Sequence, residues 1–186
     1  RARSDEQLLD FVDIFSQCTL PGGKGIGFIT RSGGAGALMA DRAEEIGLDV
    51  ATLSAETTEA LRKVVPAFGS TSNPVDITAQ GLVNPALMRD SLKILLSDPR
   101  VDAAIVWLSF TDKYAEVTVQ SFADAKAQTS KPFIVCWMGM PDVAVPLMRA
   151  AGIPYLRSAE PAVDAVAALM RYAEARRNWL SDAPAR

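Results

Sequence analysis

Short apolar runs alternate with amphipathic stretches along this chain. Runs of Ile, Val, Leu, Phe and Ala with few polar residues are typical of strands buried on both faces, and they occur at residues 26–30, 50–53, 102–109, 133–137 and 153–156. Stretches with apolar residues three or four positions apart predict helices, and they occur at about 5–17, 34–46, 54–65, 84–97, 114–128, 141–152 and from 160 onward. This alternation predicts a parallel sheet with helices on both faces.

Local signals at the ends of these stretches support the assignments. Ser4 and Gln7 form a capping box at the start of the first helix. Asn84 followed by Pro85 is a strong helix start. The segment 70–76 is polar and contains a proline, so we expect a loop there.

The size and spacing of these elements indicate the α/β class. We expect a flavodoxin-like doubly wound domain, in which a five-stranded parallel sheet of order 2-1-3-4-5 carries helices on both faces. In that order the winding reverses between the first and third strands, and ligands bind there beyond the carboxyl ends of the strands. The loops at this point are residues 31–36 and 109–114. We therefore expect these two loops to be neighbours at one edge of the sheet.

The first loop holds a glycine-rich turn that opens a helix, made of Ser32, Gly33, Gly34, Ala35 and Gly36. Backbone N–H groups in the first turn of a helix have no partner within it, and together with the helix dipole they attract phosphate. We interpret the turn as a phosphate-binding site, with the Ser32 hydroxyl as a further donor. The alternative is a tight connection needed only for packing. The turn lacks the Lys-Ser/Thr ending of a Walker A loop and the spacing of a dinucleotide fingerprint.

The second loop contributes Ser109, Phe110, Thr111 and Asp112 as further candidates for phosphate binding. Asp112 also fits the N-cap position of the helix that follows, and capping is its simplest role. The two loops are therefore competing candidates for one site.

Other polar and aromatic residues have simpler interpretations. Asn73 and Asp76 lie in the polar loop, where an Asx-type turn that rigidifies the connection is preferred over ligand contact. Trp107 and Trp137 fall within buried runs, so we expect both to serve packing. The chain shows no metal-ligand spacing, and no metal site is predicted.

Composition excludes several classes of protein. The 186 residues contain no histidine and carry a net charge of −3. A Ser-His-Asp triad, a Cys-His dyad and a phosphorylated histidine cannot therefore form within the chain, and a general nucleic-acid binder needs a more basic surface. Cys18 and Cys136 give no disulfide framework, which fits a reducing cytoplasm. No apolar run reaches the length of a membrane span.

Five segments taken together, residues 25–36, 53–61, 72–77, 95–102 and 131–132, resemble one family. The family is the NDP-forming acyl-CoA synthetases, and the similar part is their carboxy-terminal flavodoxin-like CoA-ligase domain. The family includes ADP-forming acetyl-CoA synthetase, with succinyl-CoA synthetase as a more distant relative. The resemblance suggests an N-terminal helix and linker at 1–22, a succinyl-CoA-ligase-like flavodoxin domain at 23–178 and a tail at 179–186.

The resemblance implies a module of an NDP-forming carboxylate–CoA ligase, which converts acyl-CoA, phosphate and ADP into carboxylate, CoA and ATP. In this family a histidine carries the phosphoryl group, and two helix N-termini from two domains point at it. That histidine is expected upstream of this chain, so the chain holds no catalytic residue and should be inactive alone. Its expected role is to help form the phosphohistidine pocket, through either of the two loops.

The resemblance also implies ligands and partners for the parent enzyme. No cofactor is expected to bind tightly to this chain, whereas CoA, ATP or ADP, phosphate and Mg are expected for the parent. The expected partners are CoA-binding, histidine-bearing and ATP-grasp domains of the same protein or complex, and a homo-oligomer is an option; nucleic acid and membrane are not expected. Two alternatives stay open: a regulatory synthetase-like module of a protein lysine acetyltransferase, and a free-standing nucleotide-binding flavodoxin-like protein.

Overall fold

Six parallel strands form one sheet in the computed structural model, which describes residues 1–181 without the side chain of Asp112. The strands are β1 (Gly25–Thr30), β2 (Asp49–Val50), β3 (Val75–Asp76), β4 (Ala103–Ser109), β5 (Phe133–Met138) and β6 (Tyr155–Leu156). Their order is β2-β1-β4-β5-β6, and β3 pairs with β1 beside this path. The predicted α/β class with a parallel sheet is confirmed, and the sheet differs from the predicted five strands by the short strand β3, which pairs with β1 beside the main path.

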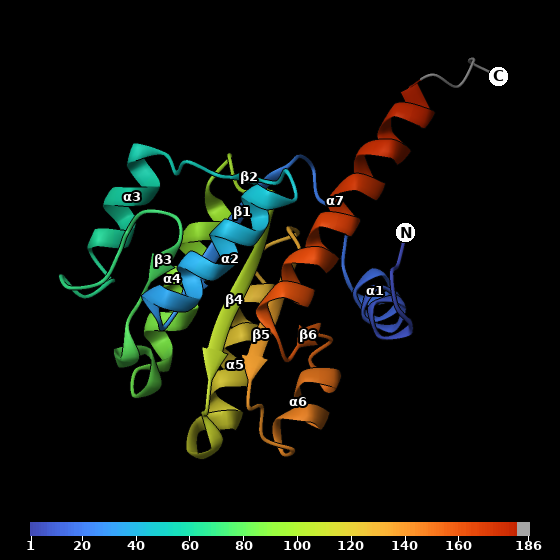
Figure 1. Ribbon diagram of the computed structural model, residues 1–186. Helices are drawn as coiled ribbons and strands as arrows, with labels where there is room; N and C mark the ends of the chain where they lie inside the picture. The colour runs from blue at the N-terminus through green and yellow to red at the C-terminus, as the bar shows by residue number, and fades with distance from the viewer. Residues whose placement is uncertain (182–186) are drawn as a thin grey trace.

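Helices cover both faces of the sheet (Figure 1). They are α1 (Asp5–Gln17), α2 (Gly33–Glu45), α3 (Ala55–Arg62), α4 (Pro85–Ser97), α5 (Ala115–Lys126), α6 (Ala144–Ala150) and α7 (Ala159–Ser181), with 3₁₀ turns η1 (Ala79–Leu82) and η2 (Asp112–Tyr114). Helices α3, α4, α5 and α6 lie on one face, and α2 and α7 lie on the other. Helix α1 packs against the outer side of α7.

Side chains of the central strands alternate between two apolar cores. In β4, Ile105 and Trp107 belong to the core under α2 and α7, whereas Val106 and Leu108 belong to the core under α4 and α5. Strand β5 shows the same alternation, and its Trp137 is fully buried. Both faces are therefore covered, which explains why these strands read as continuous apolar runs. None of the helices in residues 1–181 combines the length and apolar character needed to cross a membrane.

Helix starts follow the predicted capping signals. The hydroxyl of Ser4 accepts a hydrogen bond from Gln7 N, and the side chain of Asn84 accepts one from Leu87 N with Pro85 in the first turn. Three helices are shorter than predicted, and one of them, α5, ends at Lys126 instead of at about 128. Helix α3 ends at Arg62, before residues that Pro66 disfavours in a helix, and α6 starts at Ala144 after a turn instead of at 141.

Asn73 joins two short strands along one side of β1. Strand β2 pairs only with the first two residues of β1, and β3 pairs with its last two, Ile29 and Thr30. Between them, the Asn73 side chain accepts a hydrogen bond from Phe28 N at 2.8 Å and donates to the carbonyls of Ile26 at 2.8 Å and Ala51 at 3.0 Å.

This junction corrects two predictions. The second strand was predicted at 50–53 but ends at 50, because Asn73 takes over the hydrogen bonds of β1 beyond that point. Residues 75–76 were predicted as part of a loop but form β3. Two residues next to a proline are too few to show the alternating pattern of a strand. The strand is recognised only in the structure, by its pairing with the last two residues of β1.

We expect Asn73→Ala to lower the free energy of unfolding by about 2–4 kcal/mol, because it removes three hydrogen bonds and leaves the buried Phe28 N–H without an acceptor. Urea denaturation of the chain measures the change. Ser72→Ala is the matched control in the same loop, since Ser72 is exposed and its hydroxyl has one described hydrogen bond, with the Ser70 hydroxyl at 3.0 Å. Equal stability of the two variants would contradict the bridging role.

Candidate functional site

The loops that follow β1 and β4 lie side by side at the carboxyl edge of the sheet, and Arg31 joins them. Its Nη2 donates hydrogen bonds to the Ser109 carbonyl at 3.0 Å and to the Thr111 hydroxyl at 2.9 Å. The Thr111 hydroxyl also lies 3.2 Å from the Ser109 carbonyl, to which it donates. The two loops are therefore in direct contact, as the strand order predicts.

A buried hydroxyl fixes the turn between β1 and α2. Thr30 Oγ1 accepts a hydrogen bond from Ser32 N at 2.9 Å and donates to the Ser32 carbonyl at 2.8 Å. Gly36 N–H donates to that same carbonyl at 3.0 Å and so closes the first turn of the helix. The direction in which α2 leaves the sheet is set by this short network.

The first turn of α2 is uncapped and open to solvent. The Ser32 side chain makes no capping hydrogen bond, and among the described atoms the N–H groups of Gly33, Gly34 and Ala35 have no acceptor. Gly33 and Gly34 are exposed. Unpaired N–H groups at the positive end of a helix dipole attract anions, so this geometry is suited to a phosphate.

The three glycines of this turn have different surroundings. A Cβ on Gly36 would lie 3.0 Å from the Cβ of Pro74, so close packing explains glycine there. A Cβ on Gly33 would lie 3.3 Å from Oδ2 of Asp76. A Cβ on Gly34 would have its nearest neighbour 4.0 Å away, and its backbone is helical. Packing within the described residues therefore leaves glycine at position 34 unexplained.

Asp76 lies at the end of β3, beside the start of α2. Its Oδ1 accepts a hydrogen bond from Thr78 N at 2.8 Å, which is an Asx-type turn. Its Oδ2 is the atom close to Gly33, where the positive end of the helix dipole favours a carboxylate. Asp76 thus covers one side of the helix start, and the side at Gly34 stays open.

Phe110, at the tip of the second loop, has an uncommon backbone conformation. Its φ is +40°, and its side chain is 70% exposed. Its N–H donates to the Met138 carbonyl at 3.2 Å, and its ring covers Gly139, where a Cβ would lie 2.7 Å from Cε1. A bulky residue with a positive φ costs about 1–2 kcal/mol, so contacts around the loop must hold it in place.

Helix α5 begins later than the predicted position of its cap. The loop passes through η2, and Tyr114 occupies the N-cap position without a side-chain hydrogen bond. Asp112 was expected at the N-cap position of this helix but does not occupy it, because an intervening 3₁₀ turn, closed by Tyr114 N–H to the Thr111 carbonyl at 3.1 Å, separates it from α5. The side chain of Asp112 lies outside the described residues, so its role in phosphate binding stays a prediction.

Sequence reasoning missed Arg31. Its signal was available, since it follows a buried strand directly at the point where the winding reverses. Among the described side chains no carboxylate forms an ion pair with it. Burial of the guanidinium lowers its pKa to about 10, and it remains charged at neutral pH. The site therefore has one half-buried positive charge in addition to backbone donors.

The described residues offer no group of three or more His, Cys, Asp or Glu side chains that could hold a metal ion. Magnesium takes oxygen ligands, usually from one or two carboxylates together with substrate phosphates. We therefore assign no metal ligand in the described part of the chain.

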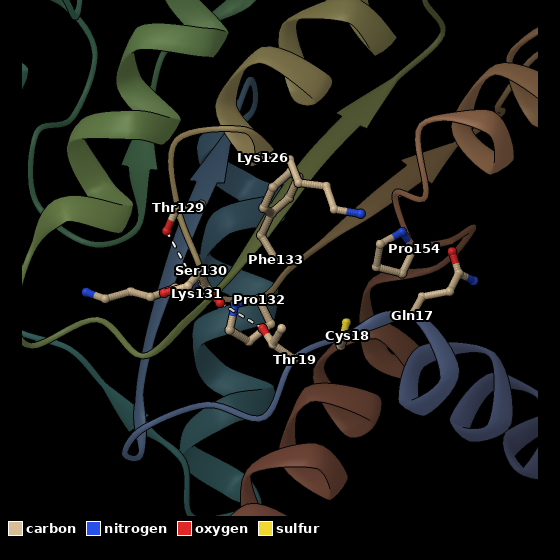
Figure 2. A pocket seen from close by; sticks show the side chains of 10 residues that line it. All are labelled: Gln17, Cys18, Thr19, Lys126, Thr129, Ser130, Lys131, Pro132, Phe133 and Pro154. Atoms are coloured by element: carbon tan, nitrogen blue, oxygen red, sulfur yellow. Dashed lines mark hydrogen bonds between the residues drawn. The ribbon is translucent and has the colours of Figure 1, made fainter.

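A hollow of about 120 Å³ lies at the opposite edge of the sheet, where β5 begins (Figure 2). It is lined by Gln17, Cys18, Thr19, Lys126, Thr129, Ser130, Lys131, Pro132, Phe133 and Pro154. Thr19 donates to the Ser130 carbonyl at 2.8 Å, and Lys126 donates to the Gly152 carbonyl. Both side chains thus already have hydrogen-bond partners in the protein, and no predicted site residue lines the hollow.

Comparison with known proteins supplies the family context. A family model described as the Ligase-CoA domain matches residues 26–178. The chain is 29% identical over 181 residues to the alpha subunit of the ADP-forming acetate–CoA ligase II of Pyrococcus furiosus, covering 93% of this chain and 39% of the relative. It is 30% identical over 175 residues to the ADP-forming acetate–CoA ligase I of Archaeoglobus fulgidus, covering 93% and 24%.

Solved structures agree with this comparison. The dinucleotide-forming acetyl-coenzyme A synthetase 1 of Ca. Korarchaeum cryptofilum, in complex with phosphate and ADP, superposes with a TM-score of 0.84 at 29% identity. The match covers 100% of this chain and 40% of that one. The chain thus spans about a quarter to two fifths of the length of the relatives it matches.

We expect Cys18 to be unreactive at neutral pH, because burial raises the pKa of its thiol to about 11 in spite of the nearby Lys126 charge. In a Cys136→Ser variant, a disulfide reagent at pH 8 should modify Cys18 about 100-fold more slowly than free cysteine, in proportion to its thiolate fraction. The rate should keep rising with pH up to about 11. The urea-unfolded chain is the control, and fast labelling of the native chain would show that the hollow activates the thiol.

Proposed function

The chain belongs to the Ligase-CoA domain family, and on that premise we propose that it is a module of an NDP-forming carboxylate–CoA ligase. The parent reaction joins acyl-CoA, phosphate and ADP to give carboxylate, CoA and ATP. Relatives named as ADP-forming acetate–CoA ligases and a 4-hydroxybutyrate–CoA ligase support this assignment. The acyl group that the parent of this chain uses is left open, because those relatives differ in theirs.

The module's proposed role is to form one side of a pocket for a phosphorylated histidine that another domain supplies. The chain itself has no histidine, so a phosphoryl carrier of that kind must come from elsewhere. The observation that carries this proposal is the exposed, uncapped start of α2 with open space at Gly34. Backbone N–H groups and a helix dipole stabilise the charge of a transferring phosphoryl group without any proton transfer.

Of the two candidate loops, the one from Ser32 to Gly36 is the better donor. Its helix starts at once after the turn and leaves its first N–H groups exposed. The loop from Ser109 to Asp112 reaches α5 only through a 3₁₀ turn, and α5 begins with the buried Ala115. We therefore propose that α2 contacts the phosphoryl group and that the second loop forms the rim.

CoA, the adenine nucleotide and magnesium are proposed ligands of the parent protein and its other domains. The proposed contribution of this module is the set of backbone donors at the start of α2. Its proposed partners are CoA-binding, histidine-bearing and ATP-grasp domains. The exposed Phe110 and Met138 beside the site are suited to contact with one of these partners.

We expect the natural full-length protein to form ATP from ADP and phosphate when one of a panel of acyl-CoA thioesters is supplied, and the 186-residue chain alone to form none. A coupled ATP assay with equal molar amounts of the two proteins measures the difference. Turnover by the chain alone would overturn its assignment as a dependent module. Absence of phosphate-dependent ATP formation by the full-length protein with every thioester would overturn the ligase assignment.

We expect Gly34→Ala to separate stability from function. A Cβ at 34 meets open space, so the variant should unfold at equal or higher denaturant, with a gain of up to about 1 kcal/mol from helix propensity. In the full-length protein it should lower phosphate-dependent ATP formation about tenfold or more, because the methyl group occupies the approach to the helix donors. Activity equal to wild type would contradict the phosphate role of the turn.

Gly36→Ala is the comparison variant in the same turn. Its Cβ would press on Pro74, so we expect it to lower the free energy of unfolding by about 1–3 kcal/mol.

A further inference from the structure

Three segments that are far apart in the sequence meet at the side chain of Arg31. Its guanidinium binds the loop after β4, through the Ser109 carbonyl and the Thr111 hydroxyl. Its aliphatic stem lies over Gly81 in η1, where a Cβ would be 3.1 Å from Cδ and 3.3 Å from Cγ of Arg31. Its own backbone leads directly into the turn at the start of α2. One side chain therefore links the loop after β4 and the turn η1 to the start of α2.

Backbone strain is concentrated in the segments that Arg31 holds. Within residues 1–181, the non-glycine residues with positive φ are Thr78, at +61°, and Phe110, at +40°. Phe110 lies between the two groups that Arg31 binds, and Thr78 caps the 3₁₀ turn that contains Gly81. Strained residues persist only where their surroundings hold them, and they cluster at functional sites.

Packing alone does not account for the half-buried Arg31. Its guanidinium donates to a carbonyl and a hydroxyl of the loop after β4, both neutral groups. Partial burial of a charged group costs desolvation free energy, and an apolar side chain of similar size would cover Gly81 without that cost. The donors that link the two loops therefore indicate a requirement for the position of the loop.

We infer that Arg31 is the positioning residue of the proposed phosphoryl site: it fixes the loop from Ser109 to Thr111 against the start of α2, so that the rim and the helix donors face one bound group. This inference rests on the proposed function. Transferring groups must be held in a narrow range of geometry, and an error of about 1 Å costs roughly 100-fold in rate. Arg31 acts through its neighbours and is not assigned any contact with the phosphoryl group.

The test compares two pairs of variants in the natural full-length protein. Thr111→Val removes one acceptor of Arg31 at nearly constant volume, and Thr111→Ser restores the hydroxyl. Arg31→Met keeps the stem over Gly81 but removes all donors, and Arg31→Lys keeps the charge. For each protein, the KM for inorganic phosphate and for the acyl-CoA thioester is measured, together with hydrogen exchange of the peptide that covers 108–115.

We expect Thr111→Val to raise the KM for phosphate about tenfold, as for the loss of one hydrogen bond to a charged group, and to speed hydrogen exchange of the loop. Arg31→Met should lower kcat/KM for phosphate about 100-fold, with the KM for acyl-CoA within about twofold of wild type. Thr111→Ser should have the KM for phosphate of the wild type. Arg31→Lys should have a kcat/KM for phosphate between those of the wild type and Arg31→Met. Melting temperatures identify any variant that fails to fold, and the milder Thr111 pair then decides.

Two results overturn the inference itself. One is unchanged hydrogen exchange of the loop in folded Thr111→Val and Arg31→Met. The other is faster exchange with an unchanged KM for phosphate, which leaves Arg31 a purely structural residue. An inactive wild-type protein would overturn the proposed function, and the inference with it, and that result is distinguishable because it needs no variant.

Discussion

The pairing of β2 and β3 along one side of β1 depends on the hydrogen bonds of the Asn73 side chain. Strand β2 leaves β1 after two residues, and the buried Phe28 N–H needs another acceptor. Leaving such a group unpaired costs about 1–3 kcal/mol. By supplying the acceptor, Asn73 lets β3 continue along the same side of β1. Strand β3 then brings Asp76 to the start of α2 and leads into the turn under Arg31.

Most of the fold could be predicted from the sequence because its elements carry local signals. The central strands are apolar throughout since both faces are covered, and α1 and α4 begin at residues that cap them, Ser4 and Asn84. Strand β3 could not be predicted, since its two residues show no period and its pairing depends on Asn73. The start of α5 was predicted within one residue, but its N-cap is Tyr114 instead of Asp112, because a 3₁₀ turn leaves no pattern in so few residues.

The candidate site could be predicted only in outline. The strand order places the loops after β1 and β4 together, and their contact agrees with it. Gly36 is required for packing and Gly34 is not, because Pro74 lies against Gly36 alone. This contact is a tertiary one, and the local sequence does not indicate it. The role of Arg31 depends on three segments at once, so no local window of sequence contains it. Local patterns thus locate a site, and long-range contacts decide which of its residues matter.

Three features that lower stability occur together at this edge. Glycine at position 34 costs roughly 1 kcal/mol relative to alanine in a helix, Phe110 holds a positive φ, and the Arg31 charge meets neutral oxygens. Natural sequences depart from local rules mainly at functional sites. In a chain of net charge −3, backbone donors at the start of α2 and the half-buried Arg31 guanidinium supply positive charge at this edge of the sheet. We propose that this local charge receives a phosphoryl group presented by another domain, which requires no basic surface elsewhere on the chain.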